Sequence, residues 1–370
     1  MFRIVFSAFI FLYFALAQAD VIAYLCSIVR GLPVVPYPWL AAMVLTVVFM
    51  FLCSRLERLL VRKSVCGLWA YVLMSWLAAF VVSLPFATPV YQLMLAVAAL
   101  MSGWLLIRWK QYLSRNDKHT ATLWSQFMPA AVELLVLCLY MGIGAAATDL
   151  EHFELRSAQS LQCGNPDEVQ TIGQKSYVTS HRLFALRCYA LSCSASKGLG
   201  HHIFAQPVPA GHSSNLLFPD DERQQLTFPC ANQEQLLGGK ARAGEAVLDY
   251  LKRSAYAAHK SGYSHARWVA DYYLCGLLLE RKLDLFAHEI AFFYSAEVAS
   301  RSLPTYYAQA LVFYTRTRMH PVLVYHDAAV EANFHDYLTL RDSYSHPVER
   351  ANRLRRTYGD TYWWWYTYSK

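Results

Sequence analysis

The sequence predicts an all-α protein in two parts, about five transmembrane helices in residues 1–148 and an extramembrane helical domain in residues 149–370. Three observations predict this fold class. Hydrophobic residues make up 56% of the chain and charged residues 16%, against about 45–50% and 25% in soluble domains. The excess of apolar residues lies in long runs before residue 148. After that point, apolar residues recur at helical spacing.

Five runs in the first part are apolar enough for transmembrane helices, which need about 20 residues each. They span residues 4–29, 39–54, 65–84, 90–107 and 127–148. The first run contains Ala17-Gln18-Ala19 before Asp20, a pattern typical of a signal-peptide cleavage site. Its apolar residues continue past Asp20, so an uncleaved anchor is the preferred interpretation and a cleaved signal the alternative.

Basic residues between these runs predict the orientation, because Lys and Arg concentrate on the cytoplasmic side of a membrane. Residues 1–148 hold ten basic and four acidic residues. Nine of the ten belong to one predicted side: Arg3, Arg55, Arg58, Arg62, Lys63, Arg108, Lys110, Arg115 and Lys118. Arg30 alone belongs to the other. We therefore expect a bacterial inner-membrane protein with a cytoplasmic N-terminus, in which five crossings place residues 149–370 in the periplasm.

Two acidic residues fall within these apolar runs. Asp20 lies in the first run and Glu133 in the last. Ionisable groups inside a membrane are functional candidates by default. Glu133, however, lies only a turn or two from the predicted cytoplasmic end and could reach the interface. A structural role is therefore the preferred interpretation for both, and few other polar residues interrupt the runs, which argues against a transporter.

The second part contains an internal similarity at a spacing of 34 residues. Tyr272-Tyr273 and Tyr306-Tyr307 are each followed by a small residue and an apolar triplet. This spacing is the period of tetratricopeptide-type helix pairs, which stack to bury a shared core and leave a concave binding surface. We expect an α-solenoid-like domain, with an irregular helical domain as the alternative. Pro304 stands where the second copy's helix should begin.

Motifs for common chemistries do not occur in the sequence. The nine cysteines form no C-x-x-C pair, and no P-loop, dinucleotide fingerprint or G-x-S-x-G motif is present. A periplasmic location would allow a disulfide such as Cys163–Cys230, which sequence alone does not assign. The second part is nearly neutral, with 23 basic and 22 acidic residues, which excludes the basic patch of a nucleic-acid-binding protein. No cofactor is expected.

Histidine-containing clusters are the weak candidates for catalysis. His201 and His202 follow a Gly-Leu-Gly turn. In the stretch HDAAVEANFHD, which begins at His326, the residues Asp327, Glu331 and His335 are spaced to share one helix face. Such a row could bind a divalent metal. It is more often a solvated polar face, and no metal site is predicted from it.

Three stretches together resemble a known family: LFALRCYALSCSASKGLGHHIFAQPVPAGHSSNLLFP, SLPTYYAQALVFYTR and RLRRTYGDTYWWWYTY. They are similar to uncharacterised multipass inner-membrane proteins of Bacteroidetes that carry a domain of unknown function. The resemblance implies membrane helices followed by a tetratricopeptide-like outer region. This chain is shorter than the family pattern, which implies fewer repeats. No activity or functional residue is implied.

The C-terminal tail is unusually aromatic, with Tyr362, Trp363, Trp364, Trp365 and Tyr366 in succession. Trp and Tyr favour membrane interfaces because the ring is apolar and its edge polar. We expect the tail to pack on the last helices of the domain or to rest on the bilayer, with stacking on a sugar or peptide ligand as a third alternative.

Function follows from this architecture only in outline. The leading hypothesis is a membrane-anchored scaffold or binding module whose partners are the lipid bilayer and a protein or envelope polymer in the periplasm. The alternative is a membrane-embedded enzyme of envelope glycan or lipid metabolism. A transporter is the third hypothesis.

Overall fold

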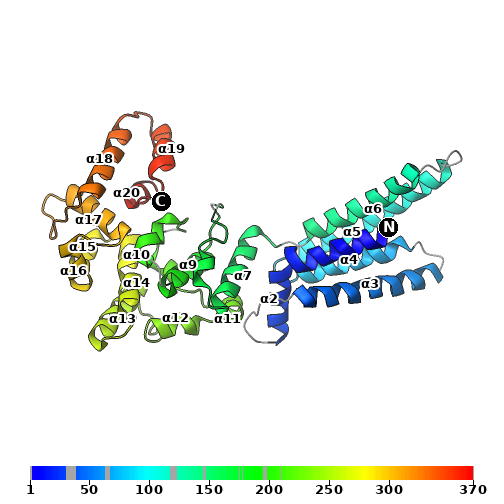
Figure 1. Cartoon of the computed structure of the whole chain (residues 1–370), viewed down its shortest axis with the longest axis horizontal. Helices are drawn as coiled ribbons and strands as arrows, with labels where there is room; N and C mark the ends of the chain where they lie inside the picture. Colours follow the sequence, from blue (N-terminus) through cyan, green and yellow to red (C-terminus); the bar gives the residue numbers. More distant parts are fainter. Residues whose placement is uncertain are drawn as a thin grey trace. The chain divides into compact units, whose positions relative to one another are not determined.

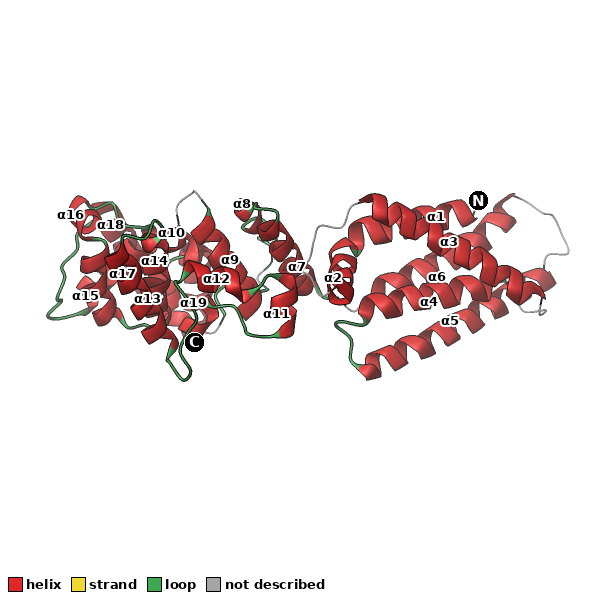
Figure 2. Ribbon diagram, turned by 90° about the horizontal axis from the view of Figure 1, so that it is seen from below, coloured by secondary structure: helices red, strands yellow, loops and turns green. Residues whose placement is uncertain are grey.

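The computed structural model describes residues 2–30, 39–62, 67–116, 123–144, 147–174, 176, 178–194, 198–209 and 211–369. All regular elements within these ranges are helices, and no strand occurs among them (Figures 1 and 2). The chain divides into two compact units, Met1–Leu155 and Arg156–Lys370. Helix α7 crosses this division, just after the boundary predicted at residue 148. Each unit is described by itself.

The N-terminal unit consists of long apolar helices. Their bounds are α1 Phe2–Leu12, a π-helical turn η1 Tyr13–Ala17, α2 Ala19–Arg30, α3 Trp39–Arg62, α4 Leu68–Ser83, α5 Pro89–Asn116, α6 Leu123–Gly144 and α7 Asp149–Gln162. The first predicted run is therefore not one straight helix. Its two halves, Arg3–Ala17 and Ala19–Arg30, are bent by 72° at Gln18, which directly follows the π-helical turn. Irregular turns of this kind are recognised neighbours of sharp kinks.

Two helices, α3 and α5, are long and apolar enough to cross a membrane. The number rises to four if α1 with α2, and α6 with α7, each form one bent span. Helix α4 is strongly apolar, but its 16 residues extend only about 24 Å, less than the roughly 30 Å of a bilayer core. The prediction of membrane helices is thus supported for two to four of the five runs. The fifth crossing and the orientation stay predictions.

Helix α3 is longer than the predicted 39–54, because Leu56, Leu59, Leu60 and Val61 continue its apolar pattern among charged neighbours. This extension brings Glu57 to Arg3, whose guanidinium donates to both carboxylate oxygens at 2.9 and 3.1 Å. The Tyr71 hydroxyl donates to the same carboxylate at 3.1 Å. One end of the unit is therefore held together by a polar contact among α1, α3 and α4.

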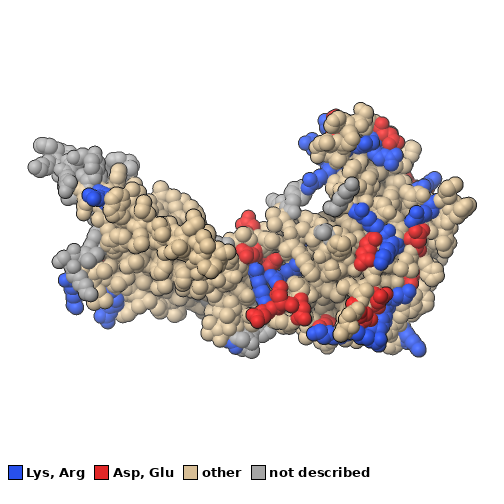
Figure 3. Space-filling model, turned by 180° about the vertical axis from the view of Figure 1, so that it is seen from behind, with Lys and Arg blue, Asp and Glu red and all other residues tan. Residues whose placement is uncertain are grey.

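Asp20, the buried carboxylate of the first run, has a partner far along the chain. Its Oδ2 atom lies 2.8 Å from Nδ1 of His152. This contact links α2 to α7 and accounts for an ionisable group in an apolar helix, as the structural interpretation expects. Glu133 is also buried, on α6. Charged side chains are sparse on the face of this unit shown in Figure 3.

The C-terminal unit is built from shorter helices. Their bounds are α8 Pro166–Val169, α9 His181–Cys193, α10 Leu199–His202, η2 Ile203–Ala205, η3 Ser213–Leu216, α11 Glu222–Thr227, α12 Cys230–Leu236, α13 Val247–Ser261, α14 Ala266–Leu279, α15 Leu283–Phe293, α16 Ser295–Ser300, α17 Thr305–Thr317, α18 Ala328–Asp342, α19 Pro347–Tyr358 and α20 Tyr362–Tyr368. Cys163 is exposed and Cys230 buried, and both are free thiols, so the disulfide considered from the sequence is not formed.

Successive helices of this unit pack on one another, α13 on α14, α14 on α15, α15 on α17, and α17 on α18 (Figure 1). The two tyrosine pairs of the internal similarity lie on α14 and α17, and all four side chains are buried in one core. Helix α17 begins at Thr305, directly after Pro304. The repeat thus marks two core helices, while its assignment to a solenoid stays a prediction.

The aromatic tail forms helix α20 and lies in this core. Thr361 caps the helix by accepting a hydrogen bond from the Trp364 amide. Tyr362, Trp363 and Trp365 are buried. The Trp363 ring packs against Phe334 and Tyr337 of α18, with ring centroids 5.2 and 6.1 Å apart. The tail therefore packs on α17 and α18 and forms part of the core of this unit.

The burial of the tail predicts unequal costs for neighbouring tryptophans. Trp363 is 0% exposed, whereas Trp364 is only partly buried. We expect Trp363→Ala to lower the free energy of unfolding by about 3–5 kcal/mol, the usual cost of removing a buried ring. Trp364→Ala should cost clearly less. Thermal unfolding of the full chain in detergent would measure both. Equal effects of the two substitutions would contradict the packing of α20 described above.

The Gly-Leu-Gly turn fits against α17 so closely that a side chain is excluded. A Cβ atom on Gly200 would lie 2.7 Å from the Tyr307 ring and 2.9 Å from Pro304. One on Gly276 would lie 3.0 Å from the end of the flexible Leu248 side chain, with Leu251 and Ser213 at the ordinary contact distances of 3.4 and 3.5 Å. Gly200→Ala should therefore destabilise the chain by about 1–3 kcal/mol. Gly276→Ala, the matched control, should cost less, and the reverse order in thermal unfolding would refute this packing.

Candidate functional site

His201 and His202 lie on α10, where His201 contacts the start of another helix, α17. The Nδ1 atom of His201 is 3.1 Å from the Thr305 hydroxyl and accepts a hydrogen bond from the Thr305 amide at 3.2 Å. This amide belongs to the first turn of α17, whose N–H groups have no partner within the helix. The His202 ring lies 6.4 Å from that of His201. His201 thus has a structural role that its sequence position did not reveal.

The same Gly-Leu-Gly turn passes over a buried carboxylate that the sequence analysis missed. Asp271 of α14 is 5% exposed, and one of its oxygens would lie 3.6 Å from a Cβ atom on Gly198. Its Oδ1 atom accepts hydrogen bonds from the Tyr307 hydroxyl, at 2.8 Å, and from the Tyr294 hydroxyl. The only sequence signal was a single acidic residue within the apolar run RWVADYYLCGLLL.

Burial raises the pKa of Asp271 to about 6, although the hydrogen bonds from Tyr294 and Tyr307 oppose the shift. Burial together with the neighbouring Asp271 also raises the pKa of Tyr307 well above its usual range. The Cys275 thiol, 3.4 Å from the Tyr307 hydroxyl, has its pKa raised by burial as well. These groups form a hydrogen-bonded network deep in the core.

The predicted row on α18 is divided among separate structural roles. Asp327 caps the helix by accepting hydrogen bonds from the amides of Ala329 and Val330 at 3.0 and 3.1 Å. Glu331 binds His326 through one oxygen at 2.8 Å and Arg316 through the other at 2.6 Å. These two partners lower the pKa of Glu331. Throughout the described part of the chain, no three His, Cys, Asp or Glu side chains are placed to hold a metal.

His335, the last residue of the row, lies in a groove between α17, α18 and α20. The groove has a volume of about 630 Å³. Its polar lining includes Arg316 and Thr317 of α17, together with Glu331 and Arg341 of α18. The remaining lining residues are Phe313, Ala332, Phe334, Tyr337, Leu338 and Thr367. Three basic side chains, of Arg316, His335 and Arg341, therefore line an aromatic groove that contains one carboxylate. No sequence motif indicated that Arg316 or Arg341 would be part of it.

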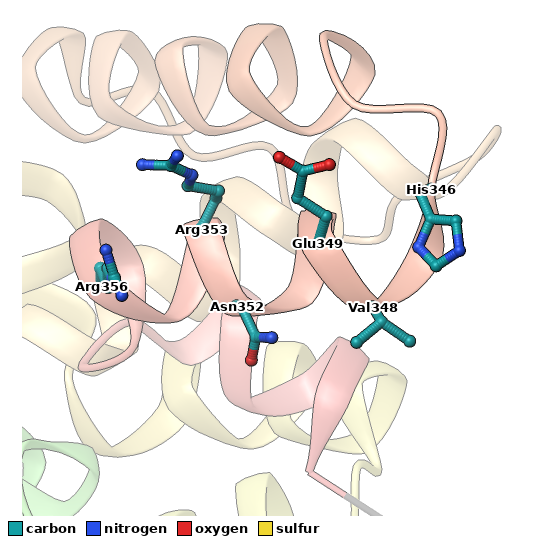
Figure 4. A pocket seen from close by; sticks show the side chains of 6 residues that line it. All are labelled: His346, Val348, Glu349, Asn352, Arg353 and Arg356. Carbon is teal, nitrogen blue, oxygen red and sulfur yellow. The ribbon is translucent and has the colours of Figure 1, made fainter.

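A second, shallower hollow lies on the basic helix α19. Figure 4 shows its six lining side chains, all from residues 346–356. Glu349 and Arg353 point to one side of the helix, whereas Val348 and Asn352 point to the other. Because these side chains do not converge, the hollow is a helix surface rather than a site. The groove is the better candidate, since small-molecule sites are concave, of about 300–1,000 Å³, and mix apolar walls with a few polar groups.

The groove lies within the part of the chain that resembles a known family. A family model described as a family of unknown function, DUF6057, matches residues 221–369. No curated protein and no solved structure matches the chain. The match supports the coarser part of the resemblance, a domain of unknown function. It does not bear on the bacterial group or on the tetratricopeptide-like assignment.

The buried carboxylate predicts how stability depends on pH. The pKa of Asp271 is about 6 in the folded chain against 3.8 for the unperturbed group. A raised folded pKa means that stability is fully present below pH 4 and is lost as the pH rises through 6. The loss should be about 3 kcal/mol.

Asp271→Asn removes this titration while keeping an oxygen that accepts from both tyrosines. We therefore expect the difference in unfolding free energy between the variant and the unchanged chain to move by about 2.4 kcal/mol between pH 4 and pH 7, in favour of the variant. Chemical unfolding of the full chain in detergent would measure it. Parallel pH profiles of the two proteins would show that Asp271 titrates normally.

Proposed function

We propose that the protein is a membrane-anchored binding module whose C-terminal unit holds an anionic ligand in the groove between α17, α18 and α20. The single observation that carries this proposal is the convergence of Arg316, His335 and Arg341 on a concave aromatic surface. Arginine binds carboxylates and phosphates in a planar, bidentate manner. Each arginine already has an acidic partner, Glu331 for Arg316 and Asp342 for Arg341, so an anionic ligand would share these guanidinium groups with the two carboxylates.

The N-terminal unit supplies the anchor in this proposal. Its two to four membrane-length helices make the bilayer its natural surroundings. The contact of Arg3 with Glu57 places the N-terminus beside the basic end of α3, which supports a common cytoplasmic side for both. An odd number of crossings would then place the C-terminal unit in the periplasm, where an envelope polymer or a protein could supply the ligand.

Enzymatic chemistry has less support than binding. The weak catalytic candidates are engaged in helix capping and ion pairs, as His201, Asp327 and Glu331 show. General acid–base catalysis requires groups within hydrogen-bond reach of one reacting atom. The groove offers one imidazole, that of His335, and a carboxylate already paired with two partners.

Filling the groove tests the proposal without disturbing the core. Ala332 is an exposed residue that lines the groove on α18, so Ala332→Trp should occlude it and leave folding intact. Ala329→Trp, on an equally exposed alanine outside the groove, is the matched control. We expect small carboxylates and phosphates to raise the thermal unfolding temperature of the full chain in detergent, and Ala332→Trp to abolish the effect.

Phosphate, glucuronate and a short acidic peptide are suitable probes for this titration. All three are anionic, but they differ in the chemical group that carries the negative charge. Arg341→Gln should weaken the response about tenfold or more, as expected for the loss of one charge-assisted contact. If no probe stabilises the chain, or if Ala329→Trp removes the response as fully as Ala332→Trp, the groove is not the site.

A further inference from the structure

The loop between α17 and α18 exposes aliphatic side chains to an unusual degree. Met319 is 93% exposed, Val322 75% and Val324 55%. Single exposed apolar residues are normal on a protein surface, but a group of them marks an interaction site. Within residues 156–369, Met319 and Val322 are the two most exposed of the large hydrophobic side chains that the structure describes.

The exposure does not come from a loosely held loop. The Val322 amide donates to the Tyr314 hydroxyl at 3.1 Å, and the Tyr325 amide donates to the Thr315 hydroxyl at 3.3 Å. Arg318 binds Asp284 of α15 at 2.6 Å. Side chains along this stretch alternate in direction: Leu323 and Tyr325 pack on the core, whereas Val322 and Val324 are exposed. The backbone contacts therefore hold Val322 and Val324 outward.

We propose that this loop, residues 318–324, inserts its aliphatic side chains into the surface of a lipid bilayer. The chain itself carries helices apolar enough to cross a membrane, so the C-terminal unit is joined in one chain to a segment that can anchor in a bilayer. Three side chains offer far less than the roughly 800 Å² per partner of a stable protein interface. They also lack the Trp and Tyr anchors that dominate such interfaces. A shallow apolar tip suits a reversible contact with lipid.

The charges around the loop are compatible with this position. Arg318 and His320 are exposed at its base, where a headgroup phosphate could accept hydrogen bonds from them. The carboxylates nearby are already engaged, Asp284 with Arg318 and Glu331 with Arg316. Neither of these two carboxylates would therefore face the membrane without a basic partner. The contact would bring the Arg316 end of the groove to the headgroup level.

Site-specific photo-crosslinking tests this proposal in the full chain. The crosslinking residue benzoylphenylalanine replaces Val322 in one protein and Val348 in the other. Val348 is the matched control, because it is a valine of the same unit that is 64% exposed on α19. Both proteins are placed in nanodiscs of phosphatidylethanolamine and phosphatidylglycerol, and adducts are identified by mass spectrometry.

We expect at least about tenfold more phospholipid adduct at position 322 than at position 348, as for a segment that partitions into the interface. A second protein with Met319→Ser, Val322→Thr and Val324→Thr, probed at position 320, should show less lipid adduct than the unchanged loop probed there. Its unfolding temperature should be unaltered, because the changed side chains are exposed. Equal lipid adducts at 322 and 348, none at 322, or a crosslink between two copies of the chain would overturn the proposal.

Discussion

The architecture of the C-terminal unit depends on one buried carboxylate. Asp271 accepts hydrogen bonds from the hydroxyl groups of Tyr294, at the end of α15, and of Tyr307 on α17. A buried carboxylate without partners would be strongly destabilising, so these tyrosines are required to lie where they do. The ring of Tyr307 in turn leaves room only for glycine at position 200. One charge thus fixes the mutual placement of α14, α15, α17 and the Gly-Leu-Gly turn.

The aromatic tail completes the core that this network organises. Tyr362 donates its backbone amide to Gln309 of α17 at 2.8 Å, and its ring packs against Phe204 at 5.2 Å. The indole nitrogens of Trp363 and Trp365 are buried with no acceptor among the described residues. Large apolar area must therefore outweigh the cost of desolvating these donors. The tail therefore stabilises the unit through the apolar area that Tyr362, Trp363 and Trp365 bury.

Sequence periodicity was sufficient for the helical class, for two to four of the five runs of membrane length and for the helices that carry the tyrosine pairs. It failed where the outcome depends on contacts distant in the chain. The bend at Gln18 and the partner of Asp20, which is His152, are of this kind. A local pattern contains no information about which helix a carboxylate will meet 132 residues later.

The candidate site illustrates the same limit. The spacing of Asp327, Glu331 and His335 predicts one polar helix face. Asp327, however, precedes the helix and caps it, so helical periodicity does not apply to this residue. Arg316 and Arg341 belong to different helices, and only the packing of α17 on α18 brings them to one groove.

The groove and the exposed loop are neighbours because both follow from how α17 ends. Arg316 and Thr317 form its last turn and line the groove, and Arg318 begins the loop. Glu331 holds Arg316 from the α18 side, while Asp284 holds Arg318 from the α15 side. Arg316 and Arg318, at the end of α17, therefore bind acidic partners on two different helices, α18 and α15. A bilayer contact at the loop and an anion in the groove would therefore both involve the last turn of α17.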